Sequence, residues 1–181
     1  QVTEGEIAAC AAAGVSVVHC PESNLKLASG FCPAEKMRQA GVNVALGTDG
    51  CASNNDLDMF GEMRTAALLA KAVAGDAAAF DAAYALRAAT LHGARAIGLG
   101  ACIGSIEVGK QADLAAVRLS DLETQPLFNV VSQLVYATGR HQVTDVWIAG
   151  QRKLAARELP DIDTAAILAK TRAWRERIAA A

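Results

Sequence analysis

The stretch that decides the fold runs from residue 15 to residue 50 and reads VSVVHCPESNLKLASGFCPAEKMRQAGVNVALGTDG. It contains two short β-branched runs, Val15–Val18 and Val42–Leu46, and each predicts a strand buried on both faces. Between them, Pro33 suits the first turn of a predicted helix, Ala34–Ala40. Strands that alternate with helices in this way predict βα units and a parallel sheet.

The segments before and after this stretch are mostly predicted helices, and a loop is predicted within it. The sequence TEGE at Thr3–Glu6 is a capping-box pattern and predicts a helix over Glu4–Ala13 that ends at Gly14. A loop is expected from Pro21 through Gly30, because proline cannot continue a strand ladder. Further helices are predicted over about Leu57–Val73, which Gly75 would end, over Ala78–Ala89, and from Thr90 to near Gly98.

After Gly104 the pattern changes to one of short strands. Strands are predicted over Ala112–Leu119, Thr144–Ala149 and, after a turn at Gly150, Gln151–Ala155, with helices over Leu127–Ala137 and Thr164–Ile178. We therefore expect βα units in residues 1–103, a strand-rich segment in 104–160 and a C-terminal helix in 161–181.

The composition limits the classes of partner. Hydrophobic residues make up 52 % of the 181 residues and the formal net charge is −2, so a packed core is expected and no nucleic-acid partner is indicated. No apolar run approaches the roughly 20 residues that span a bilayer, and no signal peptide is visible, so no membrane partner is expected. The five cysteines form no C-x-x-C pair, which argues against a disulfide framework or a cysteine zinc site and favours reduced thiols in a cytoplasmic protein.

Asp49 is the strongest single candidate for chemistry. It lies between Thr48 and Gly50, directly after the second predicted strand. In a (β/α)-barrel the chemistry takes place at the carboxyl ends of the strands. If this carboxylate is buried it needs a metal ion, an arginine or backbone amides as a partner. The alternative is that Asp49 caps the turn that follows it.

Other polar side chains follow the same two strands. His19 ends the first strand and could ligate a metal or shuttle protons, although a hydrogen-bonded packing role is favoured. The stretch Ser53–Asp56 suits turns and the cap of a helix that begins near Leu57. His92 and His141 are expected to be structural. Three scattered histidines without an H-x-H pair cannot build a zinc site by themselves.

Three segments together resemble the amidohydrolase superfamily. They read HCPESNLKLASG at His19–Gly30, VALGTDGCASNNDLDMFGEMR at Val44–Arg64 and GSIEVGKQADLAAV at Gly104–Val117. The combination of the first two is similar to the branch that deaminates 5′-methylthioadenosine and S-adenosylhomocysteine. Triazine chlorohydrolases and guanine deaminases share weaker forms of these segments.

The resemblance implies an α/β fold: the C-terminal part of a TIM-type (β/α)8 barrel, with strands seven and eight, plus the C-terminal part of a small β-sandwich domain. It also implies one divalent metal ion, zinc in most members. The family's metal ligands include an aspartate that ends strand eight, which maps onto Asp49, and this residue would also move the proton in catalysis. Substrate-binding residues are not identified by the resemblance. Candidates for the surrounding site are His19, Asn24, Ser53, Asn54 and Asn55.

The implied reaction converts an adenosine derivative, as a nucleoside substrate, into the inosine analogue and ammonia. The H-x-H and H-x-x-E motifs of the family are absent from this chain, so the isolated chain is expected to be inactive. The N-terminal half of the barrel would come from the same chain or a second chain, and a homo-oligomer is a further expectation. The alternatives are a deaminase or chlorohydrolase for guanine or a triazine, and a non-catalytic assembly module.

Overall fold

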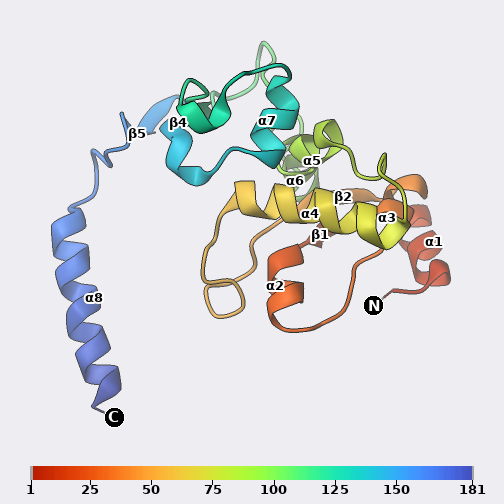
Figure 1. Cartoon of the computed structure of the whole chain (residues 1–181), viewed down its shortest axis with the longest axis horizontal. Helices are drawn as coiled ribbons and strands as arrows, with labels where there is room; N and C mark the ends of the chain where they lie inside the picture. The colour runs from red at the N-terminus through yellow and green to blue at the C-terminus, as the bar shows by residue number, and fades with distance from the viewer. Residues whose placement is uncertain (1, 181) are drawn as a thin grey trace.

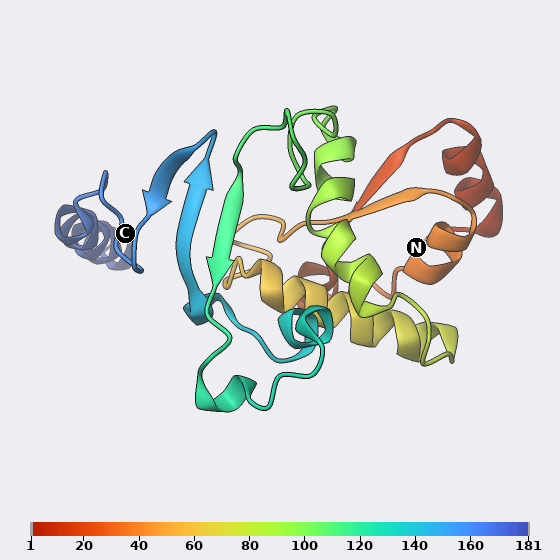
Figure 2. The same ribbon diagram turned by 90° about the horizontal axis from the view of Figure 1, so that it is seen from above.

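The structure is a computed structural model that describes residues 2–180. Its helices are α1 (Glu4–Ala12), α2 (Pro21–Lys26), α3 (Ala34–Gln39), α4 (Met59–Ala74), α5 (Ala82–Ala88), α6 (Leu91–Ala96), α7 (Val130–Tyr136) and α8 (Thr164–Ala179), with 3-10 turns η1 (Leu122–Thr124) and η2 (Arg140–Gln142). Its strands are β1 (Ser16–His19), β2 (Asn43–Leu46), β3 (Leu114–Val117), β4 (Val143–Ile148) and β5 (Gln151–Leu154). Figures 1 and 2 show the β1–β2 pair and the β3–β5 sheet on opposite sides of a group of helices.

Strands β1 and β2 pair in parallel, as the sequence predicts, and His19 lies opposite Leu46. The pairing continues beyond β2, where the Gly47 N–H donates to the His19 carbonyl at 3.1 Å. A Cβ at Gly47 would lie 2.9 Å from Cγ1 of Val18, so only glycine allows this close approach. The segments that follow the two strands therefore leave the sheet at the same edge.

The prediction that both strands are buried on both faces is wrong for β1. Val15 lies outside the strand and is 44 % exposed, and Val18 within it is 54 % exposed. The reason is that, in the part of the chain that the structure describes, β1 pairs only with β2 and has an open edge. Strand β2, by contrast, is buried from Val44 to Leu46.

Two predictions about the first helices have opposite outcomes. The capping box is confirmed, because Thr3 and Glu6 exchange hydrogen bonds at the start of α1. The loop expected through Gly30 is wrong in its first part, where Pro21 begins the helix α2. Proline suits the first turn of a helix, where its missing N–H costs nothing. Six residues are too few to show a helical period, so the sequence pattern missed this helix.

Helix α4 begins two residues later than predicted. Its N-cap is Asp58, whose side chain accepts from the Phe60 N–H, and it ends at Gly75 with a left-handed φ of 65°. The expected capping by the stretch Ser53–Asp56 is therefore wrong. Leu57 has a φ of 50°, which a right-handed helix cannot accommodate, so the helix cannot start there.

The core lies where α4 packs on α3, α5 and β2. Alanines such as Ala66 and Ala67 on α4 are fully buried, and their small side chains allow close packing of these elements. Val44 and Phe80 fill the same core and are also fully buried. Full burial of one such side chain stabilises the fold by about 1.5–3 kcal/mol. This core holds the carboxyl end of β2 in place.

The strands β3, β4 and β5 form an antiparallel sheet. The β4–β5 turn at Ala149 and Gly150 has positive φ at both residues, which suits the twist of a two-residue hairpin. Helix α8 buries none of its residues and stands apart from the rest of the chain (Figure 1). Among the described residues, no helix has the length and apolar character needed to cross a bilayer.

Candidate functional site

Asp49 lies in the loop that follows β2, and its carboxylate is held by two serines. The Ser23 hydroxyl donates to Oδ2 at 2.8 Å and the Ser53 hydroxyl donates to the same oxygen at 2.6 Å. Oδ1 is thus left without a hydroxyl donor among residues 2–180. The φ of Asp49 is 60°, in the left-handed region, which aspartate adopts more readily than most residues other than glycine.

The environment of Asp49 differs from the expected one. The residue is exposed, and its partners are serine hydroxyls rather than an arginine. The hydrogen bonds from Ser53, from Ser23 and from the Gly50 backbone lower the pKa of the Asp49 carboxyl below its usual value. The group is therefore ionised at neutral pH, which is the form that a metal ion binds.

His19 ends β1 beside this loop and is only 3 % exposed. Its Nδ1 has no hydrogen-bond partner among the described residues, and burial lowers the pKa of the imidazole to about 4. The ring is therefore neutral at pH 7. A neutral imidazole with a free nitrogen can accept or donate one hydrogen bond, depending on its tautomer.

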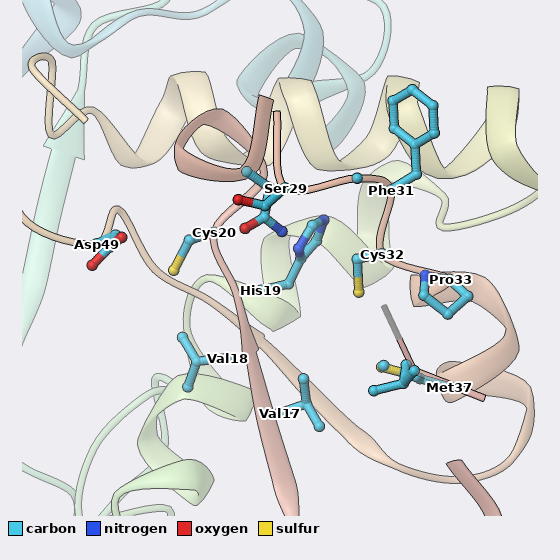
Figure 3. A pocket seen from close by; sticks show the side chains of 13 residues that line it. Val17, Val18, His19, Cys20, Ser29, Phe31, Cys32, Pro33, Met37 and Asp49 are labelled. Atoms are coloured by element: carbon cyan, nitrogen blue, oxygen red, sulfur yellow. The ribbon is translucent and has the colours of Figure 1, made fainter. Parts of the chain in front are cut away.

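A cavity of about 360 Å³ is lined by both His19 and Asp49 (Figure 3). Figure 3 shows Cys20 between these two side chains and Cys32 on the other side of the imidazole. Asn24, from α2, also lines the cavity. The volume of the cavity falls at the low end of the range of small-molecule sites.

The remaining candidates lie beside the cavity or away from it. Asn54 is buried and donates from Nδ2 to Oε1 of Glu62 at 2.5 Å. Asn55 is exposed and accepts from Nζ of Lys26 at 2.6 Å. Ser53 therefore contacts Asp49, whereas Asn54 and Asn55 form hydrogen bonds with Glu62 and Lys26.

The other two histidines, His92 and His141, lie away from the cavity. Nδ1 of His92 lies 3.1 Å from the carbonyl oxygen of Val44, and its ring packs edge-on against Tyr84. His141 is exposed and lies 3.5 Å from the carboxylate of Glu123. Neither lines the cavity that His19 and Asp49 share.

Sequence reasoning missed two residues of this site, Ser23 and Glu62. Ser23 lies in α2, whose residues were expected to form a loop, so its position relative to Asp49 could not be derived. Glu62 had a usable signal, because it falls four and eight residues before the buried Ala66 and Ala70 of α4. A charged residue on the apolar stripe of a helix indicates a specific partner.

The described residues supply only part of any metal site. They contain no group of three or more histidine, cysteine, aspartate or glutamate side chains that could hold an ion together. A tetrahedral ion of the zinc type needs three or four ligands. Asp49, with its ionised carboxylate, can provide one of them.

A parallel strand pair with polar side chains and a cavity at its carboxyl edge defines the class of α/β enzymes that build their sites on strand ends. Within this class, the chain belongs to the amidohydrolase family, whose pattern matches residues 2–153. The resemblance that the sequence motifs indicate is thereby confirmed.

The chain is similar to curated deaminases over nearly its whole length. It is 53 % identical over 180 residues to the 5-methylthioadenosine/S-adenosylhomocysteine deaminase of Teredinibacter turnerae, covering 99 % of this chain and 41 % of that protein. It is 47 % identical over 180 residues to the protein of the same name from Saccharophagus degradans, covering 99 % and 40 %. The chain thus spans about two fifths of the length of the curated relatives it matches.

Solved structures show the same similarity in three dimensions. The chain superimposes with a TM-score of 0.98 and 72 % identity on an adenosine deaminase from Xanthomonas campestris with bound zinc, covering 100 % of this chain and 41 % of that one. For the atrazine chlorohydrolase TrzN of Arthrobacter aurescens, complexed with zinc, the TM-score is 0.89 at 27 % identity, covering 96 % and 38 %. The family and these neighbours imply a TIM-barrel-type fold, of which this chain forms a part.

Proposed function

We propose that this chain contributes to the active site of a metal-dependent deaminase for adenine nucleosides. The substrates would be 5′-methylthioadenosine or S-adenosylhomocysteine, as in the names of its relatives from Teredinibacter and Saccharophagus. Water would replace the amino group of the adenine ring, and the products would be the inosine analogue and ammonia.

One observation carries this proposal: the carboxylate of Asp49 is anchored by Ser23 and Ser53 on a single oxygen. Anchoring on Oδ2 fixes the orientation of the group, and neither serine occupies Oδ1. A free aspartate would lose more rotational freedom on binding a ligand. The carboxylate is therefore organised for ligation before any ligand arrives.

The side chains present fit a zinc ion as one part of its site. Asp49 offers an ionised carboxylate oxygen, which zinc accepts as a ligand. His19 is a neutral imidazole with an unpartnered Nδ1 at the same cavity, and it could orient a ligand or a substrate atom. When bound, the metal would make water acidic enough to act as a nucleophile near neutral pH.

In the proposed reaction Asp49 moves a proton. Its carboxylate would accept the proton from the attacking water and pass it to the departing amino group, which leaves as ammonia. The two serine hydroxyls hold Oδ2 during both transfers. General acid–base catalysis of this kind is worth roughly 10²–10⁴-fold in rate.

The place of the chain within the complete enzyme is part of the same proposal. Strands β1 and β2 would be the seventh and eighth strands of the barrel, with residues 1–103 in that domain. Residues 104–160 would belong to the small β-domain, and residues 161–181 would form the C-terminal helix. The open edge of β1, with Val18 more than half exposed, supports the docking of a further barrel strand there.

The alternatives are less well supported. The identity to the triazine-acting neighbour is 27 %, against 53 % for the Teredinibacter deaminase. A non-catalytic assembly module would not need an aspartate anchored by two serine hydroxyls beside a cavity. We therefore retain nucleoside deamination as the function that the site supports best.

A chimera tests the proposal. This chain would replace the matching 41 % of the zinc-containing Xanthomonas campestris protein, to which it is 72 % identical. We expect the chimera to bind zinc and to convert 5′-methylthioadenosine and S-adenosylhomocysteine, followed as loss of the adenine absorbance and release of ammonia. Guanine and atrazine serve as comparison substrates. A folded, zinc-loaded chimera that hydrolyses atrazine or guanine and neither nucleoside would contradict the proposed function.

A further inference from the structure

We propose that Glu62, a buried carboxylate outside the cavity, is a positioning residue for Asp49. It holds together the two segments that carry the serine hydroxyls, and it acts on Asp49 only through them. The proposal deepens the proposed function and rests on it, because it assigns the residue that fixes the orientation of the metal-binding carboxylate.

Glu62 has a buried side chain with two partners from different segments. The residue is fully buried on α4. Its Oε2 accepts from the backbone N–H of Glu22 at 3.3 Å, and its Oε1 accepts from Nδ2 of Asn54 at 2.5 Å. One carboxylate thus joins the first turn of α2 to the loop between β2 and α4.

The residues that Glu62 holds are the chain neighbours of the two serines. Glu22 precedes Ser23, and Asn54 follows Ser53. Both serines donate to Oδ2 of Asp49, at 2.8 and 2.6 Å. A displacement of either partner of Glu62 must therefore move a hydroxyl that anchors the aspartate.

Helix α4 holds the same end of α2 by a second contact. The hydroxyl of Thr65 donates to Oε1 of Glu22 at 2.9 Å. Gly61 makes room for this contact, since a Cβ there would lie 3.0 Å from the same oxygen. The N-terminal turn of α2 is thus fixed by its backbone through Glu62 and by its side chain through Thr65.

When Glu62 is ionised, both of its carboxylate oxygens accept from N–H donors, so glutamine cannot replace it without loss. A glutamine at this position has one acceptor oxygen, and its amide group would point a donor at either Asn54 or the Glu22 N–H. One of the two segments would then be released. Alteration of groups that hydrogen-bond a metal ligand directly, as the two serines would, typically costs roughly 10–100-fold in metal affinity.

The test is a double-mutant cycle on zinc affinity in the full-length chimera, measured by competition with a chromogenic chelator. Glu62→Gln, which acts on these serines indirectly, should weaken zinc binding by about tenfold, the lower end of that range, when Ser23 and Ser53 are present. In the background of Ser23→Ala with Ser53→Ala, the same change should have no further effect, because the route to Asp49 is already lost. A full, additive loss in that background, or no loss with the serines present, would overturn the proposal.

Glu35→Gln is the matched control. Glu35 is a second buried carboxylate, with partners that include the Arg38 side chain and the Phe80 N–H. Its replacement should lower the stability of the chimera and leave zinc affinity unchanged. If both glutamine variants weaken zinc binding alike, Glu62 acts through general stability and the positioning role is refuted.

A milder change covers the case in which Glu62→Gln does not fold. Asn54→Ala removes only the loop side of the contact, so its effect on zinc affinity should be non-additive with Ser53→Ala and additive with Ser23→Ala. Equal coupling to both serines would contradict the proposal. The readout is zinc binding, so the two proposals can fail separately. A chimera that binds zinc but deaminates neither nucleoside would contradict the proposed function alone. A chimera that binds no zinc would contradict both the proposed function and the positioning role of Glu62.

Discussion

Replacing Asp49 with asparagine in the chimera should lower turnover by roughly a thousandfold or more and leave the fold intact. The fold should survive for two reasons. The asparagine oxygen can still accept from Ser23 and Ser53, as Oδ2 does in the structure. Asparagine also tolerates the left-handed φ of 60° found at this residue.

Catalysis should fail because the second oxygen of the carboxylate is replaced by nitrogen. With its oxygen facing the serines, the asparagine presents an NH₂ group where Asp49 has Oδ1. This group is a hydrogen-bond donor with no basicity, so it can neither ligate zinc nor accept a proton. Loss of the proton transfer alone is worth roughly 10²–10⁴-fold, and the missing ligand adds to it.

The assay is the turnover number with 5′-methylthioadenosine, measured together with zinc content and the far-ultraviolet circular dichroism of each variant. Asn55→Ala is the control, because Asn55 is exposed and its partners are Lys26 and the Cys51 carbonyl. It should keep turnover within about twofold, as expected for an exposed substitution away from the site. Unchanged turnover in Asp49→Asn with zinc still bound would refute the reasoning.

Four further results are expected. Asp58→Ala removes the N-cap of α4 and should cost about 1 kcal/mol in urea unfolding without altering turnover; a larger loss of turnover than of stability would contradict a pure capping role. Burial first, and then the nearby Glu22 and Asp58 charges, raise the pKa of Glu62 from 4.5 to about 7. Between the unfolded and the folded pKa, Glu62 is therefore protonated in the folded state and ionised in the unfolded state. The stability that this proton contributes is complete below the unfolded pKa and is lost as the pH rises through about 7. The free energy of unfolding of the unaltered chimera, minus that of Glu62→Gln, should fall by up to about 3 kcal/mol between about pH 5 and about pH 8. A difference that does not change with pH would show that the pKa of Glu62 is not raised. The isolated chain should lose zinc on gel filtration, and retention of one equivalent would show that it has more ligands than Asp49. The same chain should associate in sedimentation, since Val18 and Phe31 are more than half exposed; a stable monomer would count against an uncovered barrel edge.

The fold could be predicted from sequence where the hydrophobic pattern and the turn-forming glycine and proline residues indicate the same boundaries. The β-branched runs and the intervening glycines placed β1 and β2 within a residue and indicated their parallel pairing. The start of α4 could not be placed, because Ser53, Asn54, Asn55 and Asp58 are all good caps by residue type. Only the positive φ of Leu57, a tertiary result, selects Asp58.

The candidate site could be predicted in part, because His19 and Asn24 line the cavity with Asp49 and Ser53 donates to its carboxylate. Asp49 stood out from its place after a strand and from the family resemblance. Its surroundings depend on contacts between segments 26 residues apart, such as that of Ser23 with Asp49, which local patterns do not encode. Burial of Asn54 against Glu62 is likewise set by packing.

The left-handed backbone at residue 49 also limits which side chains could replace the proposed metal ligand there. Glutamate is as good a donor for zinc as aspartate in chemical terms. At a φ of 60°, however, aspartate and asparagine are favoured several-fold over longer side chains. Redesign of the proposed ligand at this position is therefore restricted by backbone geometry before coordination chemistry applies, and a longer carboxylate would first require a different loop after β2.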